Sequence, residues 1–267
     1  MYLFIQLYST YRFNFAFLPI DLYAYTMITH NDKFKFLEIP RVTMESGERY
    51  YVCPKYGTAL PSATTILSKF SDKKQMLIEW ERAVGSKKAD QIRTEAATLG
   101  SLVHTNVEKH IAGETRPGGS HFLRKQAYIM ADQIIEKALP DIDEFYGMEV
   151  ALAFPGLYAG TCDLIANFKG HMTICDHKSA RKMRERSSIS DYFLQLVAYG
   201  AAFNETHGTN INHGVIFMVS RDLKFETFEL LPHEWKIRTE EFFDKVERYY
   251  ESFIPPDLSV MNVKYQG

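Results

Sequence analysis

The chain has no surplus of positive charge and very little cysteine. Its 31 Lys and Arg residues face 33 Asp and Glu residues, so the formal net charge is −2 and no protein-wide basic field can attract a polyanion. Any surface that binds a polyanion must therefore be a local patch. The three cysteines, Cys53, Cys162 and Cys175, are too few and too far apart for a disulfide framework or for a four-cysteine metal or iron–sulfur site. A reducing compartment is the simpler interpretation.

Other absences narrow the class of protein further. The sequence contains no internal repeat, no low-complexity segment and no Walker A loop, so any ATP-driven work must come from another protein. Its 46% hydrophobic and 24% charged residues are typical of a globular protein with a substantial core. A chain of 267 residues is long enough for one large domain or two small ones.

The first 26 residues differ from the rest of the chain. They are crowded with Tyr, Phe and Leu and carry only Arg12 and Asp21 as charges. A transmembrane helix needs about 20 apolar residues, and polar side chains interrupt this stretch too often. It has neither the basic start of a secretory signal nor the Arg- and Ser-rich composition of a transit peptide. We expect residues 1–26 to be a misplaced translation start, with the true start at Met27; an ordered N-terminal extension is the alternative.

The periodicity of the apolar residues predicts helices first and strands later. A small β-meander is expected over Phe34 to Val52, and a helical region opens at Leu60. The expected helices cover 71–80, 86–97, the stretch after Gly100, the stretch from Ser120 to just before Pro140, 190–203 and 232–253. The expected strands cover 148–154, 161–168, 172–178, 211–220 and 224–230. This order predicts an α/β (α+β) fold with a central mixed sheet flanked by helices and an N-terminal helical layer.

Two acidic residues and a lysine lie on two neighbouring expected strands. Asp176 and Lys178 are two residues apart, so they share one face of their strand. Asp163 lies near the start of the preceding strand, and a tight turn at Lys169-Gly170 joins the two strands into an antiparallel hairpin. Asp163 and Asp176 should therefore be neighbours. Two carboxylates this close repel each other unless a cation lies between them.

This group of residues has a simpler interpretation as well. An Asp-x-Lys pair on a single strand is usually a salt bridge at the edge of a sheet. The second acid on a strand in register, preceded by Gly160, reverses that preference. Mg²⁺ prefers carboxylate oxygens, substrate phosphate oxygens and waters as ligands, and a nearby lysine can hold a phosphate. The sequence thus predicts a divalent-metal site for phosphodiester chemistry.

The pattern resembles that of the PD-(D/E)XK nuclease superfamily. Asp163 matches the first acid of that family and Asp176-His177-Lys178 matches its D-x-K, with Cys162 where the family's proline would stand. Three further similarities lie outside the hairpin, in the order that the family has them. Gly100 to His104 resembles the G-x-x-x-H and Gln195 to Tyr199 resembles the Q-x-x-x-Y of the RecB-type exonuclease branch. Glu149 matches a glutamate often found on the strand before the first acid.

Within that branch the chain is similar to the group that contains the mitochondrial genome maintenance exonuclease and its phage and bacterial relatives. The opening segment 60–67 resembles theirs, and the likeness runs from about Leu60 to Tyr199. It implies a restriction-endonuclease-like core in a single domain over 27–267, with a helical part at 60–140 and a catalytic core at 145–254. Compact size and a plain leader favour a cytoplasmic protein, in the host cytoplasm if it is phage-encoded, over a mitochondrial one.

The resemblance also implies how the site would work. Asp163, Asp176 and the backbone carbonyl of His177 would bind Mg²⁺ or Mn²⁺, with His104 completing the set of ligands. The ion would activate a water for in-line attack on phosphorus, and Lys178 would orient that water or neutralise developing charge. No iron–sulfur cluster is implied.

Three further residues receive roles from the same resemblance. Glu149 would position Lys178 or help to bind a second metal ion. Gln195 and Tyr199 lie one helical turn apart on one face, so both can reach the strand near the cut phosphate.

The expected substrate is single-stranded DNA with a free end. A local basic patch would bind it, although a solvated loop is the simpler interpretation of the same charges: Arg181, Lys182, Arg184 and Arg186. Replication or recombination proteins are candidate partners, and no membrane is expected. The leading hypothesis is a metal-dependent DNA exonuclease. An endonuclease or flap-trimming enzyme of the same fold and a DNA-end-binding module that does not cleave are the alternatives.

Overall fold

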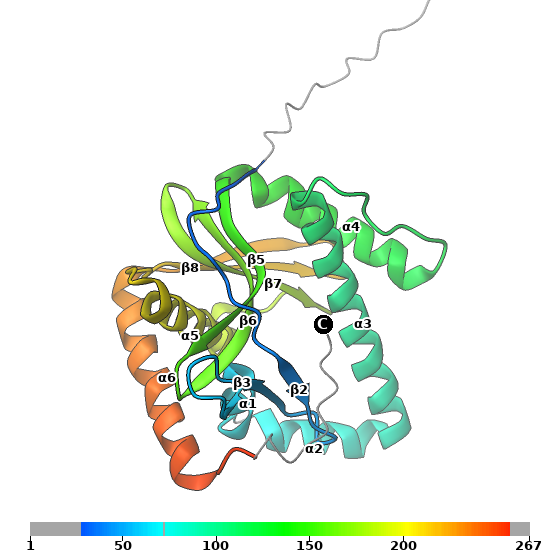
Figure 1. Cartoon of the computed structure of the whole chain (residues 1–267). Helices are drawn as coiled ribbons and strands as arrows, with labels where there is room; N and C mark the ends of the chain where they lie inside the picture. Colours follow the sequence, from blue (N-terminus) through cyan, green and yellow to red (C-terminus); the bar gives the residue numbers. More distant parts are fainter. Residues whose placement is uncertain (1–27, 72, 257–267) are drawn as a thin grey trace, which may run out of the picture.

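A computed structural model describes residues 28–71 and 73–256 of the chain (Figure 1). The expected leader, residues 1–26, and the expected start at Met27 lie outside these residues. The strands are β1 (Thr29–His30), β2 (Arg41–Thr43), β3 (Arg49–Val52), β4 (Ala59–Pro61), β5 (Ile142–Phe154), β6 (Tyr158–Phe168), β7 (His171–Ala180), β8 (Gly214–Ser220) and β9 (Phe225–Leu230). The helices are α1 (Ala63–Lys69), α2 (Lys73–Val84), α3 (Ser86–Ile111), α4 (Phe122–Lys137), α5 (Ser190–His207) and α6 (Pro232–Ser252).

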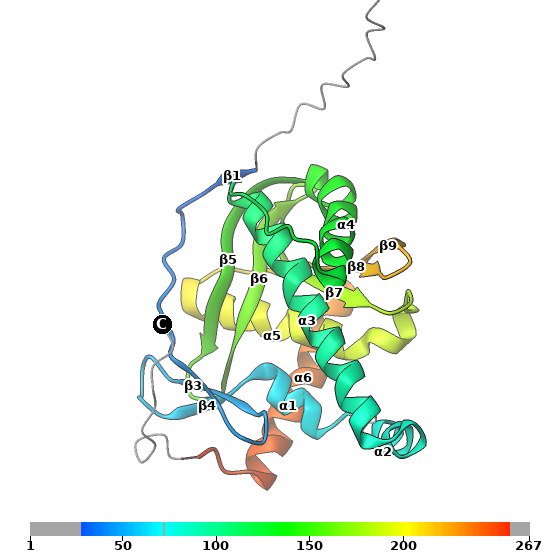
Figure 2. The ribbon, with the colours of Figure 1, turned by 90° about the vertical axis from the view of Figure 1, so that its right-hand side faces the viewer.

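A six-stranded mixed sheet forms the centre of the fold. Its strand order is β1-β5-β6-β7-β8-β9. Strands β5, β6 and β7 are antiparallel to one another, whereas β8 runs parallel to β7 because α5 carries the chain back between them. Helices α3 and α4 cover one face of the sheet, and α1, α5 and α6 cover the other (Figures 1 and 2). The expected mixed sheet between helical layers is confirmed.

The alternation of side chains along β7 explains the two layers. Ile174 packs into the apolar cluster with α5 and α6, while its neighbour Cys175 packs into the cluster with α3 and α4. Both side chains are fully buried, as expected of a strand covered on both faces. Because Asp176 and Lys178 continue the alternation begun by Ile174, they lie on the α5 side of the sheet.

A small antiparallel sheet, β2-β3-β4, packs against one end of β6. Tyr51 is buried on it together with Ala159 of β6, and the Tyr51 hydroxyl lies 3.1 Å from Thr161 Oγ1. On the other side of β3 the Tyr50 hydroxyl lies 3.2 Å from that of Tyr249 in α6. The small sheet is therefore held from both sides, close to the residues that precede Asp163.

Several expected element boundaries are wrong. One continuous helix, α3, covers residues 86–97 and those after Gly100. Gly100 lies inside this helix, where it crosses β7. Leu60 and Pro61 belong to β4, an edge strand that tolerates a proline. The cap of α4 is His121, which accepts a hydrogen bond from Leu123 N–H, and not Ser120.

The strands also differ from expectation at their ends. Strand β5 begins at Ile142 rather than at 148, and it accommodates irregular pairing before Gly147. Strand β8 begins at Gly214, three residues later than expected, since the backbone N–H of Ile211 donates to the Asn204 side chain instead of joining the sheet.

No helix within the described ranges is long and apolar enough to cross a bilayer.

Candidate active site

Asp163 and Asp176 lie at the point where β6 and β7 separate. The pairing of the two strands ends with Leu164 opposite Cys175, and the same register continued by one residue places Asp163 opposite Asp176. Beyond that point the Asp163 side chain, and not the backbone of β6, accepts the next hydrogen bond from β7: its Oδ2 lies 2.8 Å from the backbone N–H of His177. The predicted proximity of the two acids is borne out by this geometry.

Lys178 projects from β7 on the same face as Asp176. Its ammonium group forms an ion pair with Asp176 Oδ2 and lies 5.1 Å from the centre of the Tyr192 ring. Burial raises the pKa of Asp176, and the charge of Lys178 opposes that shift. Burial would lower the pKa of Lys178, but Asp176 and Asp163 outweigh it and raise the pKa instead.

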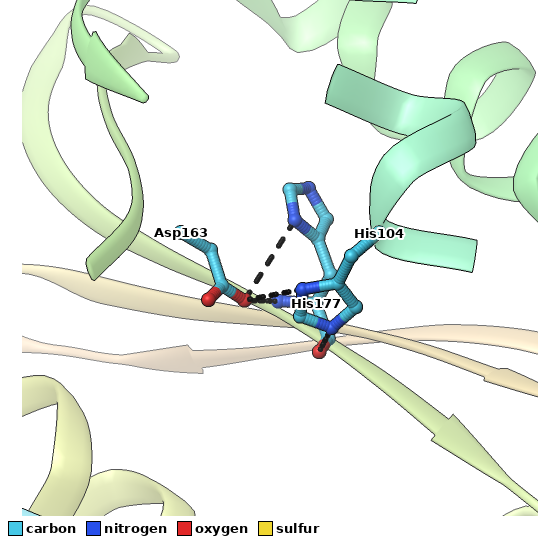
Figure 3. A group of neighbouring side chains, drawn as sticks. All are labelled: His104, Asp163 and His177. Carbon is cyan, nitrogen blue, oxygen red and sulfur yellow. Dashed lines mark hydrogen bonds and ion pairs between the residues drawn. The ribbon is translucent and has the colours of Figure 1, made fainter. Parts of the chain in front are cut away.

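His104 reaches the strand from the opposite helical layer (Figure 3). Its Nε2 lies 2.7 Å from the carbonyl oxygen of His177, and its Nδ1 lies 3.5 Å from Asp163 Oδ2. A carbonyl can only accept, so Nε2 carries a proton. Gly100 eases this approach, since a Cβ atom there would lie 3.3 Å from Ser179 Oγ, a tight contact between α3 and β7. The spacing of Gly100 and His104 is thus explained by the helix crossing.

These groups match the ligands that a divalent ion prefers. Asp163, His104 and His177 offer atoms that all lie within 4.8 Å of one another, and the carbonyl of His177 faces the same space. Asp176 is 1% exposed; its Oδ2 is paired with Lys178, and its Oδ1 has no hydrogen-bond partner among the described residues. A buried carboxylate oxygen without a partner is free to bind a cation. The residues present therefore fit Mg²⁺ or Mn²⁺.

The charge state of His104 is set by the same neighbours. Burial alone would lower its pKa, but the nearby carboxylates of Asp163 and Glu149 outweigh burial and raise the pKa to about 9. The raised pKa stabilises the metal-free fold fully below the unfolded value near 6.5, and that contribution is lost as pH rises through about 9.

We therefore expect the His104 ring to titrate near pH 9 in EDTA. The C2 proton of His104, followed by NMR and assigned with His104→Gln, measures this directly. A saturating divalent ion should move the titration well below pH 9, because the ion and the proton compete for the ring. A midpoint between pH 6 and 7 in EDTA would contradict the geometry.

Glu149 and Glu108 add two carboxylates beside His104. Glu149 Oε1 lies 3.9 Å from His104 Nδ1, and Glu108 follows His104 by one turn of α3. Burial and the charge of Glu149 raise the pKa of Glu108 to about 7. Glu149 has a left-handed backbone, φ 51°, inside β5, and such strain in a non-glycine residue is often found at functional sites. The three side chains offer ligands for a second cation, one of the two roles expected for Glu149.

Tyr199 and Gln195 meet at the site as their helical spacing predicts. Gln195 Nε2 donates a hydrogen bond of 2.9 Å to the Tyr199 hydroxyl, and both side chains face the cleft with Lys178. The buried Tyr158 hydroxyl donates to the carbonyl of Ala198 and ties α5 to β6. The Tyr199 ring lies directly over Gly160, where a Cβ atom would come within 2.5 Å of Cε1.

The contact over Gly160 predicts the effect of one methyl group. Gly160→Ala should lower the free energy of unfolding by about 1–3 kcal/mol, because the buried Tyr199 ring cannot move aside without strain. Thermal unfolding measures the change. Gly118→Ala is the matched control, since a Cβ at Gly118 has no neighbour within 4 Å. Equal unfolding temperatures for the two variants would show that Tyr199 is not fixed by this contact.

Most of these groups line one polar cleft of about 480 Å³, although Asp176 and His177 are not among its lining residues. Its walls come from the small sheet, α1, α3, α5, β5 and the part of β6 and β7 where those two strands separate. The lining residues are Arg41, Arg49, Tyr51, Ser62, Thr64, Gly100, Ser101, His104, Thr105, Glu108, Glu149, Gly160, Thr161, Asp163, Lys178, Gln195 and Tyr199. Three charged members were not predicted: Glu108, Arg41 and Arg49. The helical spacing from His104 could have indicated Glu108, but no local signal points to the two arginines.

The predicted basic patch lies outside this cleft in the described part of the chain. Arg186 donates to both carboxylate oxygens of Glu234 at 2.8 Å and stacks on Phe193, which gives it a structural contact. Arg181 lines a separate hollow of about 330 Å³ next to Arg221, and Lys182 and Arg184 are exposed. A role of these four residues in binding DNA stays a prediction.

Comparison with known proteins identifies no family. No family model matches the sequence, and no curated protein is similar to it at a significant level. Among solved structures, a candidate exonuclease from Eubacterium rectale is similar over 63% of this chain and 72% of its own, with 13% identity and a TM-score of 0.42. The protein SSO0001 is similar over 69% of this chain and 75% of its own, with 14% identity and a TM-score of 0.34. Both similarities are too remote to bear on function.

Proposed function

We propose that this chain is a metal-dependent exonuclease that hydrolyses the phosphodiester bonds of single-stranded DNA from a free end. The observation that carries the proposal is the convergence of Asp163, Asp176 and the His177 carbonyl at the separated ends of β6 and β7, with Lys178 on the next position of the same face. Carboxylates and a carbonyl suit a divalent ion, and a lysine beside them suits a phosphate.

The residues of the site would have different roles in the reaction. Asp163, Asp176 and the His177 carbonyl would hold Mg²⁺ or Mn²⁺, with His104 as a further ligand once its Nε2 proton is released. When bound, the ion would neutralise charge on the phosphate and make a nearby water more acidic. Lys178 is placed to orient that water or to donate to a phosphate oxygen as negative charge develops there. The Gln195–Tyr199 pair would support the wall of the cleft at Gly160, three residues before Asp163 on β6.

Circular and linear single strands distinguish the exonuclease from its alternatives. An exonuclease should shorten an end-labelled linear strand in Mg²⁺ and leave a circular strand of the same sequence intact. Cleavage of the circle would identify an endonuclease of the same fold. Binding of the linear strand with no cleavage in either Mg²⁺ or Mn²⁺ would identify a DNA-end-binding module.

A further inference from the structure

One wall of the cleft carries positive charge that the proposed chemistry does not use. Arg49 and Tyr51 lie two residues apart on β3 and share one face of the small sheet. Arg41 pairs with Tyr51 across β2 and β3, so its side chain lies on the same face. All three residues line the cleft that holds Asp163.

No carboxylate in the described part of the chain neutralises either guanidinium. Arg49 Nη2 donates to Thr64 Oγ1 at 2.7 Å, and Thr64 Oγ1 lies 3.0 Å from Ser62 Oγ, which fixes the guanidinium over the N-terminal turn of α1. Within residues 28–71 and 73–256, neither Arg41 nor Arg49 forms an ion pair. A guanidinium has five N–H groups, so Arg49 keeps donors for an anion.

The position of this wall relative to the metal ligands is also fixed. The Tyr51 hydroxyl contacts Thr161, and Thr161 precedes Asp163 by two residues on β6, which is about 7 Å along a strand. The carboxylates of Glu108 and Glu149 also line the cleft and lie together beside His104. A nucleic-acid strand lying in the cleft can therefore present one phosphate to Lys178 and the metal ligands and a neighbouring phosphate to the arginines.

We propose that Arg41 and Arg49 bind the backbone phosphate next to the one that is cut. This inference rests on the proposed function, because it takes a nucleic-acid strand as the occupant of the cleft. Arginine suits the task better than lysine, since its planar fork donates two parallel hydrogen bonds to phosphate oxygens. In this arrangement the small sheet positions the nucleic-acid strand, while β6 and β7 hold the proposed metal ligands and Lys178.

Binding of a fluorescein-labelled single-stranded DNA by the full chain in EDTA, followed by fluorescence anisotropy at several KCl concentrations, tests the proposal. Arg41→Ala/Arg49→Ala should weaken binding about tenfold or more. The slope of log K against log salt should become shallower by about 0.7, which corresponds to one lost phosphate contact. Arg49→Lys should keep the slope but bind more weakly than the wild type. The matched control is Arg124→Ala, an exposed arginine of α4 outside the cleft, which should leave both quantities unchanged.

The outcomes separate this inference from the proposed function. If the wild-type chain neither binds nor cuts single strands, the proposed function is wrong and this inference falls with it. If the wild type binds and cuts them but the double variant matches Arg124→Ala in affinity and slope, the phosphate role of the arginines is wrong and the exonuclease proposal stands. Arg41→Ala alone removes an exposed side chain and should shift affinity in the same direction, which excludes misfolding as the cause.

Discussion

Asp176→Asn is expected to reduce cleavage of single-stranded DNA on the order of 10³-fold or more, because the proposed metal site would lose a charged ligand. The same change should remove the stabilisation of the fold by metal. A divalent ion at a hundredfold excess over its Kd stabilises the wild type by about 2.7 kcal/mol. We therefore expect Mn²⁺ to raise the unfolding temperature of the wild type and to leave that of Asp176→Asn nearly unchanged.

The matched control for this prediction is Asp143→Asn. Asp143 is an exposed aspartate at the start of β5, outside the cleft. It should cleave and respond to Mn²⁺ as the wild type does. If Asp176→Asn keeps wild-type cleavage while its fold is intact, the assignment of Asp176 as a metal ligand is wrong.

Lys178→Met is expected to lower kcat by about 10²–10³-fold, the usual effect of losing one charged group that stabilises the transition state. Methionine keeps most of the side-chain length, so the change removes the charge of Lys178 and its ion pair with Asp176. Because the proposed role of Lys178 is on the phosphate and not on the ion, we expect the rise in unfolding temperature with Mn²⁺ to persist. Steady-state kinetics with an end-labelled strand and thermal unfolding with Mn²⁺ measure the two quantities.

A lysine outside the site provides the comparison for that variant. Lys125→Met removes an exposed charge from α4 and should leave kcat unchanged. A loss of Mn²⁺ stabilisation in Lys178→Met would show instead that Lys178 holds the metal ligands in place. Unchanged kcat would remove Lys178 from the chemistry.

The sequence predicts those parts of the site that depend on hairpin register, strand alternation and helical spacing. The turn at Lys169-Gly170 fixes the register of β6 and β7, and the register alone brings Asp163 opposite Asp176. The alternation along β7 likewise places Lys178 on the face of Asp176, and the helical spacing of Gln195 and Tyr199 produces their hydrogen bond. Each of these relations spans a few residues or one short hairpin.

The remainder of the site depends on contacts between distant segments. Arg49 lies more than a hundred residues from Asp163 in the chain, and only the docking of the small sheet through Tyr51 and Thr161 brings them to one cleft. Gly100 was expected to lie between two helices, because glycine usually weakens helices. In the structure it lies inside α3, where the helix passes Ser179 of β7, a long-range contact that no local pattern reveals.

Asp163, Asp176 and the His177 carbonyl are proposed to hold a divalent ion at which the DNA strand is cut. Anomalous diffraction from crystals of the chain soaked in MnCl₂ is the most direct test, because manganese can be located without ambiguity. We expect a manganese peak between these three groups, in contact with His104, that disappears in Asp176→Asn. Manganese bound elsewhere, or no manganese in a crystal whose cleft is open to solvent, would contradict it.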